Sequence, residues 1–203
     1  MTPNRRFAGV MSNQMRIARS LFFAIALAGC VTELKGPPRG YPVELRGLGD
    51  SPAYPMKVAG FERGAILAYE PGMKHLSTAY DLRTPEAQIA STIYLVPLES
   101  SASPISAQLG REKAAIEQYH PGAVLLEEME VEISKSGVTY KGLKAAYALD
   151  GEFMNRRQRL YSEVMLWIHK DRYVKFRSTA PMAQREMAVL KNRELLNAVN
   201  WAF

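Results

Sequence analysis

The residue with the most definite chemistry in this sequence is Cys30, the only cysteine among 203 residues. One cysteine cannot form an internal disulfide, so no disulfide framework holds this fold together. Its thiol is the one nucleophile in this sequence that is suited to forming a thioether. Two small residues, Ala28 and Gly29, precede it and let the backbone enter a narrow protease site. This arrangement predicts covalent modification of Cys30 beside a cleavage site.

The segment before Cys30 has the pattern of an export signal. Residues 1–29 contain no acidic residue and four arginines, followed by an apolar run over residues 21–28. A basic region, a short apolar core and small residues before a break are typical of secretory signals. The run reaches only about half of the ~20 residues that a transmembrane helix needs. The stretch that begins at Met15 is the more typical signal, so we expect translation to start at Met15 or Met11 rather than at Met1.

Leu27-Ala28-Gly29-Cys30 resembles the lipobox of bacterial lipoproteins. In that family the cysteine sulfur receives a diacylglyceryl group, the peptide is cut before the cysteine, and the new amine is acylated, typically with palmitate. The resemblance implies lipid attachment at Cys30 and recognition of Leu27, Ala28 and Gly29 by the signal peptidase. Val31 in place of aspartate implies sorting to the outer membrane, facing the periplasm. Two alternatives remain: an ordinary secretory site with Cys30 as a bystander, and a buried core element.

Other chemistry-bearing residues lack the spacing that a catalytic or metal site needs. The histidines are His75, His120 and His169, and the chain contains no HExxH, CxxC or phosphate-binding glycine motif. Ser77 and Ser91 have no GxSxG elbow around them. His120, beside a Pro-Gly pair, is expected to end a helix, where a cationic ring suits the dipole. We therefore predict no catalytic residue, no metal and no cofactor, with a metal site shared by the histidines as the weaker alternative.

Acidic and basic side chains gather in two places. One place is an acidic stretch that alternates with apolar residues: Glu128, Glu130 and Glu132. This alternation predicts the solvated face of a strand. The alternative is a pair of catalytic carboxylates drawn from these three residues and Glu127. The densest basic cluster is expected in a hairpin connection and consists of Arg156, Arg157 and Arg159. It could contact lipid phosphates, an acidic partner or peptidoglycan. The alternative is a solvated hairpin with Glu152 and Glu163 nearby.

The net charge shifts when the export signal is removed. The whole chain has 26 basic and 20 acidic residues, a formal charge of +6. The part that begins at Cys30 has 22 basic residues against 20 acidic ones, a formal charge of +2. The basicity therefore lies largely in the signal, and nucleic acid is not an expected partner.

Residues 30–55 are predicted to be the lipidated N-terminus and a tether, followed by a single domain over residues 56–203. Five prolines and four glycines within residues 31–55 disfavour a helix or a central strand. The segment between Tyr41 and Leu45 is the place where an edge strand could form. Plain disorder of the tether is the alternative.

Within the domain, alternating and β-branched stretches predict seven strands, with Gly142 expected to bulge one of them. The strands are expected over residues 61–69, 75–82, 89–96, 125–134, 138–149, 160–168 and 173–178. A helix is expected after Ser103-Pro104, through residue 118. Both faces of the strand over residues 160–168 are apolar, which indicates a central position in the sheet.

A second helix is predicted after Pro181, from Met182 to about Ala202. Its expected sheet-facing stripe follows helical spacing and consists of Ala183, Met187, Leu190, Ala198 and Trp201. The alternative, a helix lying on a membrane surface, is disfavoured because the charges on this segment are mixed in sign.

The order of elements predicts an α+β fold: a mainly antiparallel sheet of six to seven strands with two packed helices, in an α/β/α sandwich-like arrangement. At the level of element order, the domain resembles the PsbP/Mog1-type sandwich, a likeness of fold that says little about activity.

Three functions are compatible with the sequence. The first is a lipid-anchored envelope lipoprotein with a non-enzymatic domain that binds or scaffolds another envelope component. The second is an envelope hydrolase acting on cell wall or lipid, which requires a histidine and a carboxylate in one polar site. The third is a small-ligand carrier, whose site would be lined by Tyr69, Tyr80, Tyr94, Tyr140 and Tyr147.

Overall fold

Nine β-strands form one antiparallel sheet in the computed structural model, which describes residues 40–45, 53–98 and 104–200. The strand order is β1-β3-β4-β5-β9-β8-β7-β6, and β2 also pairs with β3. The bounds are β1 Val43–Glu44, β2 Lys57–Val58, β3 Phe61–Ala68, β4 Leu76–Arg83, β5 Gln88–Pro97, β6 Val124–Lys135, β7 Val138–Phe153, β8 Arg156–His169 and β9 Arg172–Pro181. The predicted export signal and Cys30 lie outside the described residues.

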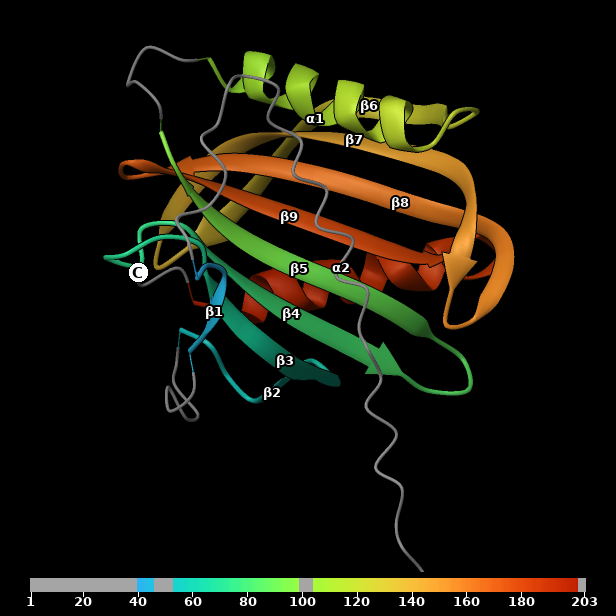
Figure 1. Ribbon diagram of the computed structural model, residues 1–203, viewed down its shortest axis with the longest axis horizontal. Coiled ribbons are helices and arrows are strands. Elements are labelled where there is room, and N and C mark those ends of the chain that lie inside the picture. Colours follow the sequence, from blue (N-terminus) through green and yellow to red (C-terminus); the bar gives the residue numbers. More distant parts are fainter. Residues whose placement is uncertain (1–39, 46–52, 99–103, 201–203) are drawn as a thin grey trace, which may run out of the picture.

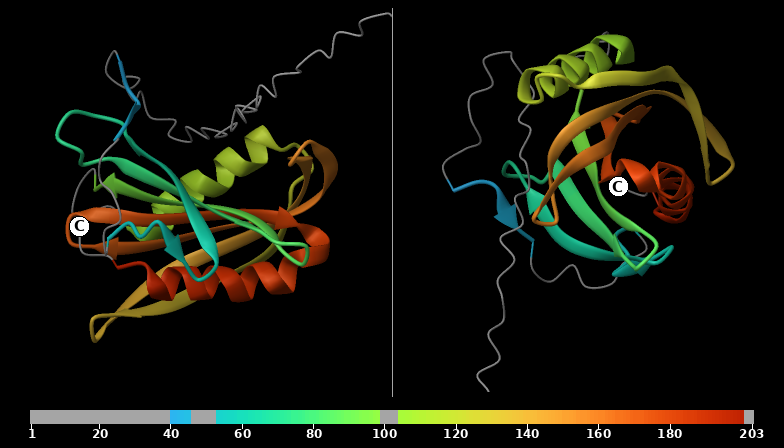
Figure 2. Two further views of the ribbon diagram at one scale, coloured as in Figure 1. Left: turned by 90° about the horizontal axis from the view of Figure 1, so that it is seen from below. Right: turned by 90° about the vertical axis from the view of Figure 1, so that its right-hand side faces the viewer.

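Two helices cover parts of the two faces of this sheet. Helix α1 (Ile105–Tyr119) packs against β7 and β8. A 3-10 turn, η1 (Met182–Gln184), leads into α2 (Arg185–Ala198), which packs against β5, β6 and β9 on the other face. Figure 1 shows α1 and α2 on opposite sides of the sheet, and Figure 2 shows the sheet curling around α2. The α+β class and the sandwich-like arrangement are therefore confirmed.

The number of strands was predicted too low. Strands β1 and β2 have two residues each, so neither is long enough to give an alternating pattern. The expectation of an edge strand between Tyr41 and Leu45 is confirmed by β1, which pairs with the end of β3. The other strands lie where alternation placed them, within a few residues at their ends.

Strand β8 lies between β7 and β9, as its apolar faces predicted. Tyr161 and Trp167 belong to the hydrophobic core on the α2 side. Val164 and Leu166 belong to the core on the α1 side. A strand buried on both faces cannot show the hydrophobic-polar alternation of an edge strand.

The hairpin between β7 and β8 is longer than predicted. Met154 and Asn155 form a two-residue turn with φ of 50° and 61°, and pairing continues to Phe153 and Arg156 on either side. The prediction that Arg156, Arg157 and Arg159 lie in a loop connection was therefore wrong, because they lie on β8. Because their side chains are polar, these residues show no strand pattern. Their pairing with β7 depends instead on backbone hydrogen bonds and on turn residues that tolerate positive φ.

Gly142 does not bulge β7, contrary to prediction. It pairs with Val131 on β6 and with Trp167 on β8 in an unbroken register. A Cβ at this position would meet the Leu166 carbonyl and lie 2.5 Å from Trp167 Cδ1. The glycine is therefore required by the close approach of the Trp167 ring.

The predicted sheet-facing stripe of the C-terminal helix was also wrong. Met187 and Leu190 are 37% and 52% exposed, and Ala198 faces solvent. The buried side of α2 consists of Ala188, Asn192, Leu195 and Leu196, continued by Val199. A polar residue, Asn192, lies at the centre of this buried side, so a search for an apolar stripe selected the opposite face. Trp201 lies outside the described residues.

Candidate functional site

The structure separates the three histidines. His75 precedes β4, His120 ends α1, and His169 ends β8 with its ring 5.3 Å from that of Tyr140. Among residues 40–45, 53–98 and 104–200, no group of three or more His, Cys, Asp or Glu side chains is placed to hold a metal ion. The described helices include none long and apolar enough to cross a membrane.

His120 ends α1 as predicted, with its backbone N–H donating to the Ile116 carbonyl at 2.9 Å. The cationic ring expected there is not supported, however. Burial and the nearby Arg177 both lower the pKa of His120 from its ordinary value. A lowered pKa favours the neutral ring at neutral pH, so the ring adds little charge to the helix end.

Ser77 and Ser91 lie on opposite faces of the sheet. Ser77 is 3.1 Å from the Tyr69 hydroxyl. Ser91 is buried on the α2 side, where its Oγ lies 3.1 Å from both Asn192 Oδ1 and Ser178 Oγ. A nucleophilic serine needs a base within hydrogen-bond reach, and neither serine has a hydrogen bond to a histidine among these contacts.

The acidic stretch on β6 is a solvated strand face, as predicted. Glu128, Glu130 and Glu132 are exposed on one side of β6, and Glu128 also forms an ion pair with Lys113 of α1. Glu127 points to the other side and lies 2.5 Å from Lys144 Nζ. The four carboxylates therefore do not form a catalytic pair.

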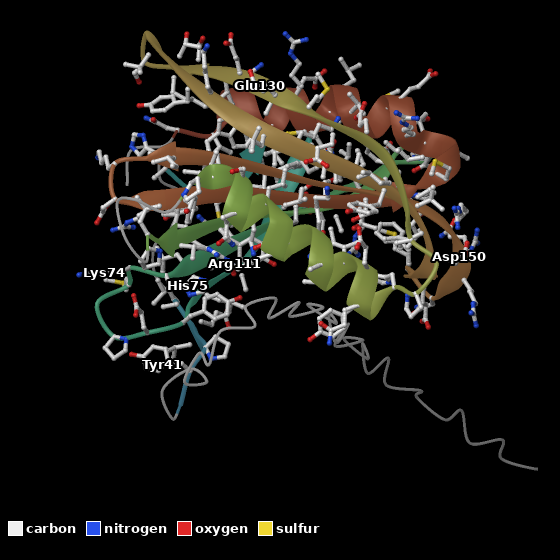
Figure 3. All side chains as sticks on the ribbon, turned by 90° about the horizontal axis from the view of Figure 1, so that it is seen from above. Tyr41, Lys74, His75, Arg111, Glu130 and Asp150 are labelled. Atoms are coloured by element: carbon white, nitrogen blue, oxygen red, sulfur yellow. The ribbon has the colours of Figure 1, made fainter. Side chains whose placement is uncertain are left out.

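The arginines of β8 lie at one end of the molecule. Arg156 and Arg157 are exposed, and Arg159 pairs with Asp150 at 3.1 Å. Figure 3 places Asp150 at the opposite end from His75. Both members of the Arg159–Asp150 pair are at least 40% exposed, and such exposed pairs contribute little to stability. This surface is basic and open to solvent.

A buried polar network joins α2 to the sheet. Asn192 donates to Glu163 at 2.7 Å and to Ser178 at 2.8 Å. The Tyr161 hydroxyl also donates to Glu163 at 2.7 Å, and Lys144 lies 3.2 Å from the same carboxylate. Glu163 and Asn192 are fully buried. A network closed to solvent holds the helix in register and is not accessible to a ligand.

A second polar group lies on the other face, at the border of α1, and is called here the α1-side cluster: Ser77, Tyr94, Glu112, Lys175 and Arg177. The sheet register places Ser77, Tyr94 and Lys175 side by side on β4, β5 and β9. Arg177 is two residues beyond Lys175 and therefore on the same face. Within the described part of the chain, no helix covers β3, β4 and β5 on this face (Figure 1).

Helix α1 contributes the carboxylate of the α1-side cluster. Glu112 is 1% exposed and accepts a hydrogen bond from Lys175 Nζ at 2.9 Å. The same oxygen accepts from Gln108 Nε2 at 3.0 Å. Lys175 Nζ also lies 4.6 Å from the centre of the Tyr94 ring. Lys175 is thus held by a buried ion pair and an aromatic face, which fixes α1 on β9.

Arg177 has no such partner. Its Nη1 atom is buried and lacks a hydrogen bond. Burial lowers the pKa of Arg177 from its ordinary value, while Glu112 and Tyr94 raise it. Buried polar atoms are nearly always hydrogen-bonded in native proteins, so an unpaired guanidinium nitrogen requires an explanation.

Tyr69 and His75 border the α1-side cluster. Their rings stack with centroids 4.5 Å apart. Burial and the nearby Lys175 lower the pKa of His75 to about 4, so this ring is neutral at neutral pH. Figure 3 labels His75 before β4 and Arg111 on α1, the two elements that flank the cluster.

The tyrosines expected to line one ligand site do not share a location. Tyr69 and Tyr94 lie at the α1-side cluster. Tyr80 and Tyr140 are on the α2 side, and Tyr147 is buried with its hydroxyl donating to Glu117 of α1 at 3.1 Å. The expectation of a single tyrosine-lined site was therefore wrong.

Sequence reasoning did not select Glu112, Lys175 or Arg177. One signal was available: Lys175 and Arg177 have the two-residue spacing that places both on one face of the predicted strand, while Val174 and Phe176 place apolar side chains on the other face. Two cations on one face of a central strand require partners. The carboxylate that pairs with Lys175 comes from a helix 63 residues away, which no local pattern indicates.

Comparisons with known proteins give a likeness of fold alone. No family model matches the chain, and no curated protein matches it. Among solved structures, a Pseudomonas aeruginosa protein of unknown function matches 78% of this chain and 95% of its own, at 12% identity with a TM-score of 0.50. Cyanobacterial PsbP from Synechocystis also matches, over 70% of this chain and 92% of its own, at 11% identity. Its TM-score is 0.37.

Proposed function

We propose that this protein is a lipid-anchored envelope lipoprotein of the outer membrane, whose periplasm-facing domain binds or scaffolds another envelope component without catalysing a reaction. The observation that carries the anchoring is the sequence Leu27-Ala28-Gly29-Cys30 after a basic and apolar signal. Several acyl chains on one residue provide stable attachment, whereas a single chain binds a bilayer only marginally.

A binding role is favoured over hydrolysis by where the reactive side chains lie. Ser91 is enclosed in the buried network with Asn192 and Ser178. Ser77 contacts a tyrosine hydroxyl. A hydrolase needs a nucleophile, a base and an oxyanion site in one place. The described residues supply exposed or half-buried charged surfaces instead.

Two surfaces are available for binding. The exposed arginines of β8 suit an anionic partner such as lipid phosphates or peptidoglycan, and they are Arg156, Arg157 and Arg159. The α1-side cluster favours a second candidate function, that of a small-ligand carrier, because it places Lys175 and Arg177 on one face of β9 beside the Tyr94 ring and the Ser77 hydroxyl. The two surfaces have different ligands and are tested separately.

The anchor is tested by growing the producing cells with a palmitate analogue that carries a detectable tag. We expect the wild-type protein to be labelled and to fractionate with membranes, because Cys30 is acylated. Cys30→Ser is expected to lose the label and leave the membrane fraction. Ser20→Ala, a change of similar size in the same segment, is the control and is expected to behave as wild type. Unchanged labelling or fractionation of Cys30→Ser would contradict the proposal.

Binding through the β8 arginines is tested with vesicles that contain anionic lipid and with purified peptidoglycan. A variant with glutamine at all three positions is expected to lose at least half of the bound protein at low salt, because these side chains supply phosphate or carboxylate contacts. The control variant carries glutamine at Lys57 and Lys141, two exposed lysines outside this surface. Equal binding by both variants would remove the arginine surface from the proposal.

A further inference from the structure

The unpaired Nη1 nitrogen of Arg177 is the strongest indication of a ligand in the described part of the chain. Its Nη1 atom is buried without a hydrogen-bond partner. Glu112, the carboxylate of the α1-side cluster, already accepts hydrogen bonds from Lys175 and Gln108. The α1-side cluster therefore contains two cations, Lys175 and Arg177, against one carboxylate.

The neighbours of Arg177 on the sheet are hydroxyl groups and an aromatic ring. The strand register places Thr92 beside Arg177, and Tyr94 beside both Ser77 and Lys175. Thr92, Tyr94 and Arg177 are half-buried, so solvent reaches this part of the sheet although the guanidinium nitrogen is covered. His75, at the border, is neutral and adds no competing positive charge.

We propose that the α1-side cluster binds an oxyanion, the carboxylate or phosphate group of a small ligand, with Arg177 as its principal contact. A planar guanidinium matches the two oxygens of either group, and such charge-assisted bonds are among the strongest in proteins. The bound oxyanion supplies the partner that Arg177 lacks and balances the excess positive charge beside Glu112. Lys175 remains with Glu112, so the ligand is bound without breaking the contact that holds α1.

The inference deepens the binding function proposed above and rests on it, while its test does not depend on the lipid anchor. The protein used is the chain with Cys30→Ser, which stays free of lipid. Inorganic phosphate and acetate are titrated separately by calorimetry in a buffer without other oxyanions. The two titrations distinguish a phosphate site from a carboxylate site.

We expect saturable binding of at least one of the two anions, weakened about tenfold or more by Arg177→Gln, which removes the charge and the paired donors. Arg177→Lys keeps the charge but not the planar pair of donors, so its affinity is expected to fall between those of wild type and Arg177→Gln. Arg193→Gln, at an exposed position of α2 outside both proposed binding surfaces, is the matched control and is expected to bind as wild type.

Two results would overturn the inference: no binding of either anion, or equal affinity of wild type and Arg177→Gln. If Arg177→Gln does not fold, Arg177→Lys and Tyr94→Phe decide the question by the same titration. Unchanged affinity in Arg177→Lys would exclude the guanidinium as the principal contact. Failure of this test with intact palmitate labelling would leave the lipoprotein proposal standing and remove the oxyanion site alone.

Discussion

Replacing Asn192 by alanine is expected to detach α2 from the sheet more than any other single truncation on that helix. The side chain is fully buried and its amide group makes three hydrogen bonds. The bond to Glu163, at 2.7 Å, involves a carboxylate, and a hydrogen bond to a charged group contributes about 1.5–3 kcal/mol. The bonds with Ser91 and Ser178 are between neutral groups and contribute about 1 kcal/mol each.

The expected loss in the free energy of unfolding is therefore about 4 kcal/mol, a large share of the roughly 5–15 kcal/mol that stabilises a typical domain. The Glu163 oxygen left behind has no route to water, because this residue is fully buried. Lys144 and Tyr161 still contact the other oxygen, Oε2, so the larger part of the loss is the unpaired Oε1 atom rather than an uncompensated charge.

The assay is urea unfolding followed by far-ultraviolet circular dichroism, on the chain with Cys30→Ser. Asn197→Ala is the matched control: the same change, on the same helix, at an exposed side chain. It is expected to change the free energy of unfolding by less than about 0.5 kcal/mol. A loss below about 1 kcal/mol for Asn192→Ala would refute the view that the buried network holds α2.

Three further predictions use the same unfolding assay. Gly142→Ala is expected to lower the free energy of unfolding by about 3 kcal/mol, because its Cβ would meet the Leu166 carbonyl and Trp167. Gly110→Ala, which has open space around it in α1, is expected to raise the free energy of unfolding by about 1 kcal/mol. Equal effects of the two substitutions would contradict this. Arg177→Met is expected to raise stability by about 1 kcal/mol in buffer without oxyanions, because it removes an unpaired buried nitrogen, and a loss would indicate a structural role. Lowering the pH from 7 to 5 is expected to destabilise wild type by about 1 kcal/mol more than it destabilises His75→Phe. In the unfolded chain the His75 ring takes up a proton near its ordinary pKa of 6.5, whereas the folded ring, with a pKa of about 4, stays neutral. Equal pH dependence of the two proteins would exclude this role of His75.

The longer strands could be predicted because their side chains alternate, or are apolar on both faces, over eight or more residues. Strand β6 is the clearest case: Glu128 and Glu130 face solvent, while Val131 and Ile133 face α2. Strand β1 was expected only as an edge strand somewhere between Tyr41 and Leu45, and β2 was not found, since pairing of so short a segment is decided by the position of β3. The start of β8 was missed because its arginines are polar on both faces, and the turn before it sets the pairing.

The orientation of α2 and the α1-side cluster depend on contacts distant in the sequence. Asn192 is buried because it donates a hydrogen bond to Glu163 on β8. A prediction made from apolar residues alone therefore places the buried side of α2 on the opposite face of the helix. Glu112 on α1 and Lys175 on β9 meet only after the sheet has formed. The spacing of Lys175 and Arg177 indicates two cations on one face, but not which of them lacks a partner.

The most direct test of the central claim is mass spectrometry of the N-terminal peptide of the protein isolated from the membranes of its producing cells. The account predicts a peptide that begins at Cys30 and carries a diacylglyceryl group on the sulfur and an acyl chain on the amine. A peptide with an unmodified Cys30, or one that begins upstream of it, would contradict the lipid anchor.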